Sequence, residues 1–494
     1  MRLISGCVGR EQYRVDYRPT NRQVTLNNKI TSFLGWAAAL VGVLVANSAV
    51  ADVTLVEKDG WTVFMNGRIQ AFANYNVGTG KPRNLKDNNC ATPGDWATCS
   101  DVEIRGGGID QSDALTEWPA GTDLQRTTDR GVVQELRLRT GFTGNVLGFG
   151  IKKQLTERTE ILGYTAVTVG IDSDLRRKFS DSRPDWRESY LRLSGPAGTL
   201  SAGRMLTLHS RGATEITYLY GYRYGLGFAG GVSSASRSSA GSVGFGVLGN
   251  GFGAGLTYAT PSFAGVTLEA GIYDANNVVG TQLLERTRWP RVEFEGAYDR
   301  AFPWGVVKVF ANGAWQELYD YSGTPRKAVV WGVGYGGRLE VGPFRLGLAG
   351  HRGQGIGVTY ALEPHGSLYF VERAQAEAAA TVKMRTVEGY YAQAQVWLGK
   401  AVDVRAGAGV THVQRIEEDV SPWNPETAPS VGWVILNRQI GLGGGATYHY
   451  RDQVHFTAEV FYADFEWYRP IPDPGGMTPK QYMQSVNLGV TYDF

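Results

Sequence analysis

The sequence feature that most constrains the fold is an alternation of apolar and polar residues, which recurs in stretches of about ten residues. In 291–299, apolar or aromatic side chains occupy every second position, and Arg, Glu or Asp occupies most of the others. The ranges 391–398, 402–411 and 453–462 repeat the pattern. Because successive side chains of a β-strand point to opposite faces, each stretch predicts a strand with one face in an apolar medium and one in water.

The apolar faces do not suit a soluble β-sandwich. Their members are often Ala, Gly or Val, which are poor partners for the interdigitated core between two sheets. Aromatic residues gather near the ends of the expected strands: Trp61, Tyr75, Trp467, Tyr468, Tyr492 and Phe494. Beyond residue 51 no apolar run reaches ~18 residues, so no spanning helix is expected. These features predict an all-β chain that forms a transmembrane antiparallel β-barrel, whose closure satisfies every strand edge in lipid.

Composition agrees with many strands and turns. The 494 residues include 66 Gly and 25 Tyr, and 19% are charged, which is unlike a helical membrane protein or a disordered chain. The net charge of +2, without a dense run of Lys and Arg, gives no reason to expect a nucleic-acid partner.

Segments with strand character number about sixteen, an even count that leaves both chain ends on the periplasmic side. They are 61–76, 131–154, 158–172, 185–195, 198–205, 251–261, 264–275, 290–301, 304–318, 328–341, 343–352, 381–399, 401–416, 436–451, 453–468 and 483–494. The stretch 131–154 is either one long strand or a strand followed by a loop. Short connectors alternate with long ones at 77–130, 206–250, 353–380 and 417–435, as periplasmic turns and outer loops do.

The N-terminus carries an export signal. Lys29 precedes an apolar stretch at 33–46, and Ala49-Val50-Ala51 forms an A-x-A cleavage site, so residues 1–51 are expected to be a signal peptide with an over-long leader. A start codon near Val24 would give a leader of normal length. The mature chain, 52–494, would be the barrel. A membrane-anchoring helix is the alternative, but the apolar run is short.

Cys90 and Cys99 bracket a loop-like stretch rich in small and polar residues. A disulfide between them is expected in an oxidising compartment. Zinc is disfavoured because no His or third Cys is near them in sequence.

Several segments resemble the general porins of Gram-negative bacteria. The stretch 57–75 resembles the family's first strand, 147–155 its second, and 187–204 the fourth and fifth; 256–274 resembles the strands after the long third loop, and 483–494 the terminal strand. The resemblance implies an outer-membrane homotrimer whose third loop folds inward and narrows a water-filled pore. It also implies passive diffusion of small hydrophilic solutes and ions without a cofactor.

The family's basic wall residues can be carried over at two positions. Arg68 occupies the basic position of the first strand, and Arg204 that of the Arg before the inward loop. Val146 stands where the family has another Arg, and the acidic patch of the third loop is missing. The constriction is therefore expected to differ from the family's opposed-charge arrangement.

Alternation assigns further charges to the lumen. Arg68 shares a face with Asn66, Gln70 and Asn74, whereas on the lipid face near the midplane it would cost ~2–4 kcal/mol. If Leu136, Leu138 and Phe142 face lipid, then Glu135, Arg137 and Arg139 face inward. Simple alternation places Arg204 on the same face of its strand as Leu200 and Ala202, so we expect a bulge or bend to turn it to the lumen.

The third loop itself contributes Arg211, Glu215, Arg223 and Arg237. Because charge at a constriction sets selectivity, this excess of Arg predicts a weak anion preference.

The chain ends on a strand pattern, with Tyr492 and the final residue Phe494 on its apolar face. The resemblance implies that this terminal Phe is recognised by the outer-membrane barrel assembly machinery.

Catalytic motifs are missing from the sequence. The six His make no H-x-x-x-H or HExxH pair, and His209-Ser210 lacks a G-x-S-x-G elbow, so neither a metal site nor an enzyme is expected. The alternatives to an open channel are a structural or adhesin barrel plugged by its own loops, and a sugar-selective porin lined by Tyr218, Tyr220, Tyr222 and Tyr224. These tyrosines are more simply explained as packing the loop against the wall.

Overall fold

A computed structural model gives the architecture of the chain. It describes residues 52–79, 132–171, 184–227, 241–249, 251–275, 289–320, 326–358, 368–371, 381–414, 435–468 and 480–494. These residues belong to one compact unit, 42–494. Within them, no helix is both long and apolar enough to cross a membrane.

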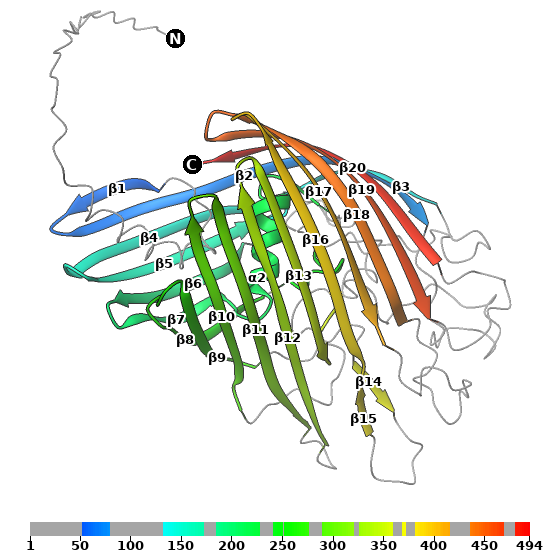
Figure 1. Ribbon diagram of the computed structural model, residues 1–494, viewed down its shortest axis with the longest axis horizontal. Helices are drawn as coiled ribbons and strands as arrows, with labels where there is room; N and C mark the ends of the chain where they lie inside the picture. The colour runs from blue at the N-terminus through cyan, green and yellow to red at the C-terminus, as the bar shows by residue number, and fades with distance from the viewer. Residues whose placement is uncertain are drawn as a thin grey trace, which may run out of the picture. The chain divides into compact units, whose positions relative to one another are not determined.

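The described residues form a closed antiparallel β-barrel (Figure 1). The sheet has 18 strands, but β20 and β1 follow one another along β2, and so do β3 and β4, which leaves 16 positions in the wall. In chain order the strands are β1 (Val53–Lys58), β2 (Trp61–Thr79), β3 (Val132–Arg139), β4 (Asn145–Thr156), β5 (Thr159–Val169), β6 (Asp185–Gly195), β7 (Gly198–Leu206), β8 (Phe252–Ala259), β9 (Val266–Tyr273), β10 (Arg291–Phe302), β11 (Gly305–Asp320), β12 (Arg326–Val341), β13 (Phe344–Gln354), β16 (Thr386–Leu398), β17 (Val402–Val413), β18 (Ile435–Tyr450), β19 (Val454–Tyr468) and β20 (Lys480–Asp493). A separate two-stranded hairpin joins β14 (Leu368–Val371) to β15 (Thr381–Met384).

The barrel closes where β20 pairs with β2, from Arg68 opposite Asp493 to Gly78 opposite Met483. Where β20 ends, β1 continues along the same edge of β2, with Val53 opposite Met65. Sequence analysis did not predict β1, because its six residues are too few to show a clear period.

The long stretch 131–154 is two strands. β3 pairs with the C-terminal part of β2, residues 72–79, and β4 pairs with its N-terminal part, residues 61–68. A turn at 141–144 separates β3 from β4. The turn carries Phe142 into the barrel, where its backbone N–H donates to the Gly225 carbonyl at 2.8 Å. The expectation that Phe142 faces lipid is therefore wrong, because the turn resets the alternation after Arg139.

Alternation holds along the rest of the wall. In β10, Val292 and Phe294 are 42% and 52% exposed, whereas Glu293 and Glu295 between them are 1% and 5% exposed. The same outward apolar face recurs at Ile69 and Leu488. An apolar outer surface and a polar interior are what a barrel in a bilayer requires.

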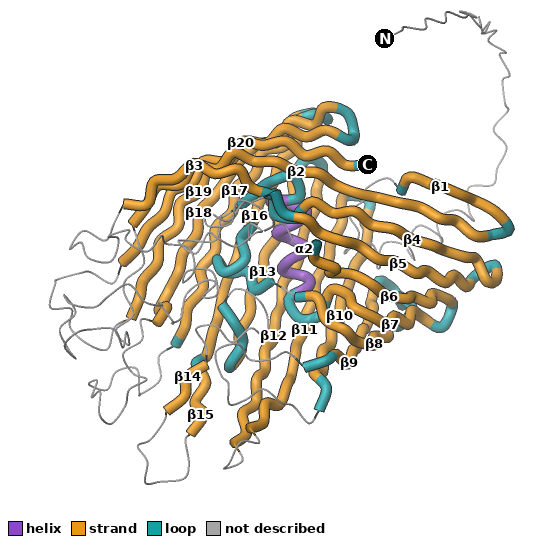
Figure 2. Tube along the Cα trace, turned by 180° about the vertical axis from the view of Figure 1, so that it is seen from behind, coloured by secondary structure: helices purple, strands orange, loops and turns teal. Residues whose placement is uncertain are grey.

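The connectors divide by length between the two ends of the barrel. Tight turns, such as 399–401 and 451–453, join strands at one end, which in outer-membrane barrels is the periplasmic end. Residues 207–251, which we call loop 3, join β7 to β8. Loop 3 contains α2 (Arg211–Thr217) and the π-helical turn η4 (Tyr218–Tyr222), and α2 is enclosed by the wall (Figure 2). The inward-folded third loop is thus confirmed.

Candidate functional site: the barrel interior and loop 3

Loop 3 crosses the lumen. It leaves β7 and its helical segment contacts β11, β12, β13, β16 and β17, on another part of the wall. Further along, the Gly246 N–H donates to Thr411 Oγ1 at 2.9 Å, and Leu226 and Gly227 reach β19. Loop 3 is therefore attached to several separate strands of the inner wall.

Two wall glutamates hold the two ends of the helical segment. Glu293 Oε2 accepts the N–H groups of Leu208 and His209 at 2.7 and 2.8 Å. Glu459 Oε2 accepts those of Leu226 and Gly227 at 3.0 and 3.1 Å.

Each of these glutamates also pairs with an arginine on the wall. Arg291 lies 2.8 Å from Glu293, and Arg405 lies 2.7 Å from Glu459. Hydrogen bonds to a charged acceptor are stronger than neutral ones, so the two carboxylates are strong anchors for the loop.

Arg211 at the start of α2 faces acidic wall residues. Its Nη2 lies 2.8 Å from Glu269 and 2.5 Å from Glu295. Burial alone would lower the pKa of Arg211, but these two carboxylates raise it above its ordinary value. Arg211 is therefore a neutralised cation that ties α2 to β9 and β10.

Glu215 on α2 makes the opposite arrangement. Its side chain is 2% exposed, and its two oxygens lie 2.5 Å from Lys308 Nζ and 3.0 Å from Arg338 Nη1. Arg338 also lies 3.5 Å from Asp299. An acid on the loop thus faces bases on the wall here, while a base on the loop faces acids on the wall at Arg211.

Arg68 lies in the lumen, as alternation predicts, and is 2% exposed. Its guanidinium forms a two-pronged ion pair with Asp493, at 2.5 and 2.8 Å, across the β2–β20 closure. Its Nη1 donates to the Arg223 carbonyl at 3.1 Å, and the Arg223 side chain lies over the rings of Tyr218 and Tyr224. Arg68 therefore joins the barrel seam to the return arm of loop 3.

Arg204 points outward. Arg204 and Ala202 are both exposed. β6 and β7 pair continuously, from Gly195 opposite Gly198 to Ser189 opposite Arg204, without the register shift that a bulge would cause. The expected bulge that would turn Arg204 to the lumen is not present in β7, so that expectation is wrong. Arg137 and Arg139 lie opposite Asn74 and Phe72 on the inward side of β3, and Arg139 is 1% exposed.

Two tyrosines of loop 3, Tyr220 and Tyr222, are buried and pack the loop inside the barrel. Tyr220 donates to Glu340 Oε1 at 2.7 Å, and burial raises the pKa of its hydroxyl. Tyr222 is 3% exposed and belongs to an apolar group inside the barrel, here called the lumen cluster. Its buried members are Tyr222, Phe245, Leu248, Ala314, Val330, Ile356, Val358, Val387, Val413, Phe461, Ala463, Phe465 and Met483.

At the C-terminus, Tyr492 is on the outer face, 42% exposed, and its ring stacks with that of Phe494 at 5.7 Å. The backbone of Phe494 exchanges two hydrogen bonds with Gly67, at 2.8 and 3.0 Å. Cys90 and Cys99 lie outside the described residues. Among the described residues, His, Cys, Asp and Glu form no group of three or more suited to a metal ion.

Sequence reasoning missed Glu293, Glu459, Asp403 and the pair His449 and His455 as interior anchors. The alternation of β10, β17, β18 and β19 showed that these side chains face inward, but it did not show which residues they contact.

A family model for Gram-negative porins matches residues 37–415. The chain belongs to the Gram-negative porin family. This porin is accordingly an outer-membrane β-barrel channel. The comparison with curated proteins gives no match.

Solved porin-like structures share the fold at low identity. The outer-membrane channel DcaP of Acinetobacter baumannii is 11% identical with a TM-score of 0.57, over 90% of this chain and 100% of that one. An anion-selective porin from Comamonas acidovorans is 11% identical with a TM-score of 0.50, over 88% of this chain and 100% of that one.

Proposed function

We propose that this porin is a passive diffusion channel for small hydrophilic solutes and ions, narrowest where loop 3 crosses the lumen. The observation that carries the proposal is the position of loop 3, which is fixed to opposed parts of the wall by Glu293 and Glu459. The interior beside it is polar and charged, as an aqueous path requires.

Ion selectivity should be weak, because the charges around loop 3 nearly balance. Among the described residues, eight basic side chains and nine acidic ones contact loop 3 or pair with its wall partners. The basic residues are Arg68, Arg211, Arg223, Arg291, Lys308, Arg338, Arg345 and Arg405, and the acidic ones are Glu215, Glu269, Glu293, Glu295, Asp299, Glu340, Asp403, Glu459 and Asp493. The anion preference expected from the Arg count of the loop stays a prediction, and this pairing argues that any preference is small.

Single-channel conductance in planar bilayers tests the proposal, together with reversal potentials under a KCl gradient. Steps of stable conductance with a reversal potential near zero would support it. A folded barrel that gives no conductance would contradict it, and strong cation or anion selectivity would contradict the balanced constriction.

A second candidate, the loop-plugged barrel, is favoured by the lumen cluster. Tyr222, Phe245 and Leu248 of loop 3 share this apolar group with Ile356 and Val358, which follow β13. An apolar contact between two loops inside the lumen opposes the passage of water. The conductance measurement distinguishes this candidate, because a plugged barrel passes little current.

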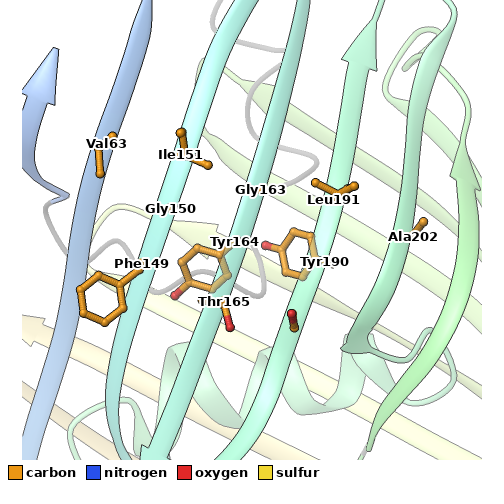
Figure 3. A pocket seen from close by; sticks show the side chains of 11 residues that line it. Val63, Phe149, Gly150, Ile151, Gly163, Tyr164, Thr165, Tyr190, Leu191 and Ala202 are labelled. Carbon is orange, nitrogen blue, oxygen red and sulfur yellow. The ribbon is translucent and has the colours of Figure 1, made fainter. Parts of the chain in front are cut away.

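We also propose that the barrels assemble as homotrimers through the outer face of β2–β7. A groove of about 450 Å³ lies there, over Gly163, between Val63, Phe149, Ile151 and Leu191 (Figure 3). The hydroxyl-bearing residues Thr165 and Ser189 line the same groove, and the exposed Arg204 follows on β7.

Polar groups on an outer face are better satisfied by a second copy of the chain than by lipid. Crosslinking through Ser189→Cys, compared with Leu346→Cys on the outer face of β13, tests this. Equal crosslinking of the two variants would contradict the assignment.

Finally, we propose that residues 1–51 are removed on export and that the mature chain begins at Asp52. In support, Asp52 already contacts the barrel, because its Oδ1 accepts a hydrogen bond from Asn66 Nδ2 at 3.0 Å. N-terminal sequencing of the protein from membranes tests this; a mature chain that still begins upstream of residue 52 would contradict it.

A further inference from the structure

Besides loop 3, a second connector turns into the lumen directly after β13. Its first four residues, 355–358, are called here the inward segment. Ile356 is 0% exposed and Val358 is 1% exposed, and both belong to the lumen cluster. The Gly355 N–H donates to the Arg385 carbonyl, just before β16, at 3.1 Å. The inward segment is therefore tied to the wall at its base and buried inside the barrel.

Ile356 packs directly against the backbone of the inner wall. Gly332 of β12 and Gly353 of β13 are opposite one another. A Cβ at Gly332 would lie 2.9 Å from Ile356 Cγ2, and a Cβ at Gly353 would lie 2.7 Å from Ile356 Cδ1. Glycine in a strand interior often marks a place where another part of the chain approaches closely. These two glycines therefore provide the space that the inward segment occupies.

The lumen cluster joins the inward segment to loop 3 on one side of the barrel. Loop 3 contributes Tyr222, Phe245 and Leu248. The wall members belong to strands between β11 and β20, and they are Ala314, Val330, Val387, Val413, Phe461, Ala463, Phe465 and Met483. Among the residues that the structure describes, no buried member of the cluster lies on β4–β9. The return arm of loop 3, residues 223–227, is held on the same side, because two of its backbone N–H groups donate to Glu459 of β19.

The side of the lumen beside β5–β7 is less filled. Leu162, Arg192 and Thr199 face inward within a few residues of the tight turns, and all three are half-buried. On the other side, Thr447 of β18 and Thr457 of β19 lie similarly near the tight turns but are 0% and 4% exposed. Loop 3 and the inward segment therefore leave the two sides of the lumen unequally open.

We propose that the lumen cluster is an apolar partition, which closes one side of the lumen and leaves the side beside β5–β7 open to solutes. Ile356 and Val358 complete the partition and so help to set the size limit of the channel. The physical basis is that an apolar constriction excludes water and therefore ions. The inference rests on the proposed channel function. It differs from the plugged barrel, because the partition blocks one side only.

Cysteine accessibility in planar bilayers tests the partition in the mature, folded protein, with 2-sulfonatoethyl methanethiosulfonate as a charged thiol reagent. Thr199→Cys, on the open side, should react, and the added sulfonate should lower the conductance. Val358→Cys, inside the partition, should stay unmodified and keep its conductance. The parent protein, treated in the same way, corrects for reaction at Cys90 and Cys99.

A charged substitution tests whether the dry contact closes that side. Val358→Asp places a carboxylate inside the cluster and hydrates it, so the conductance should increase about twofold as the second side opens. Val358→Leu is the matched control, because it changes the packing without adding a charge. Its conductance should equal that of the wild type.

The outcomes separate the two proposals. A folded wild-type barrel that passes no current would overturn the channel function. If the wild type conducts, modification of Val358→Cys with a loss of current would overturn the partition alone. An unchanged conductance in folded Val358→Asp, or an equal increase in Val358→Leu, would also overturn it. If Val358→Asp yields no folded barrel by heat-modified gel mobility, the comparison of Thr199→Cys with Val358→Cys decides.

Discussion

Glu459→Gln should release the return arm of loop 3 while leaving the barrel folded. The Glu459 side chain is fully buried, and it accepts from Leu226 N, Gly227 N and Arg405 Nη2. A glutamine places an NH₂ group toward one of these donors and removes the charge opposite Arg405. Breaking a buried ion pair from one side costs about 3–5 kcal/mol.

The cost of Glu459→Gln should lie at the lower end of this range of about 3–5 kcal/mol. The reason is that Asp403, 3.4 Å from Arg405, still provides this arginine with a carboxylate. A cost of about 3 kcal/mol corresponds to about a 100-fold increase in local opening, since every ~1.4 kcal/mol is tenfold. The strands around the anchor keep their ladder of hydrogen bonds, so the increase should be confined to the loop.

Hydrogen–deuterium exchange of the peptide containing Leu226 and Gly227 measures this opening. Glu466→Gln on the same strand is the control, because the Glu466–Arg438 pair is 30% and 41% exposed and such pairs are worth ~0–1 kcal/mol. Exchange of the two amides at the same rate in both variants would refute the anchoring role of Glu459.

Four further predictions test other parts of the structure. Leu488→Arg, at a position 57% exposed in the middle of β20, should lower the free energy of unfolding by ~2–4 kcal/mol in urea titrations in lipid. Leu398→Arg, beside a turn, should lower it by only ~0–1 kcal/mol. Equal costs of the two variants would contradict the membrane position. Glu215→Gln removes the carboxylate facing Lys308 and Arg338, so reversal potentials should shift toward anions, and a shift toward cations would count against the pairing. Deletion of Phe494 should reduce assembled barrel in membranes more than the conductance of the barrels that do assemble; normal yield would contradict the assembly role. Burial lowers the pKa of His209 from 6.5 to about 3, so the unfolded chain takes up a proton first, and stability should fall as the pH drops from about 6.5 toward about 3. In His209→Gln the urea concentration at the unfolding midpoint should decrease less over that pH range. The same decrease in the variant and the wild type would argue against a neutral His209.

Much of the barrel could be predicted from sequence because a strand's alternation is a local property. Val292 and Glu293 are adjacent in sequence and lie on opposite faces of the wall, as the pattern required. The two errors have local causes. The turn before β4 resets the phase at Phe142, and β7 keeps its phase at Arg204 although a lumen charge was expected there.

The interior contacts could not be predicted, because they join residues far apart in sequence. Glu293 and Leu208 are 85 positions apart, and Glu459 and Leu226 are 233 apart. Their pairing depends on where loop 3 lies inside the closed barrel. The sequence showed that the loop is rich in Arg, but only the structure shows that Arg211 is held by Glu269 and Glu295.

The end-to-end placement of β20 and β1 along β2 has a consequence for how the chain can be rewired. Phe494 pairs with Gly67, and Val53 pairs with Met65. The end of β20 and the start of β1 are therefore neighbours along β2, and the two strands run in the same direction. A circular permutant that joins Phe494 to Asp52 and opens the chain at the tight turn 399–401 should preserve every strand pairing. Such a protein would keep the seam intact while moving the free C-terminus to another strand, and would therefore separate the role of Phe494 in closing the wall from its role as a terminal residue.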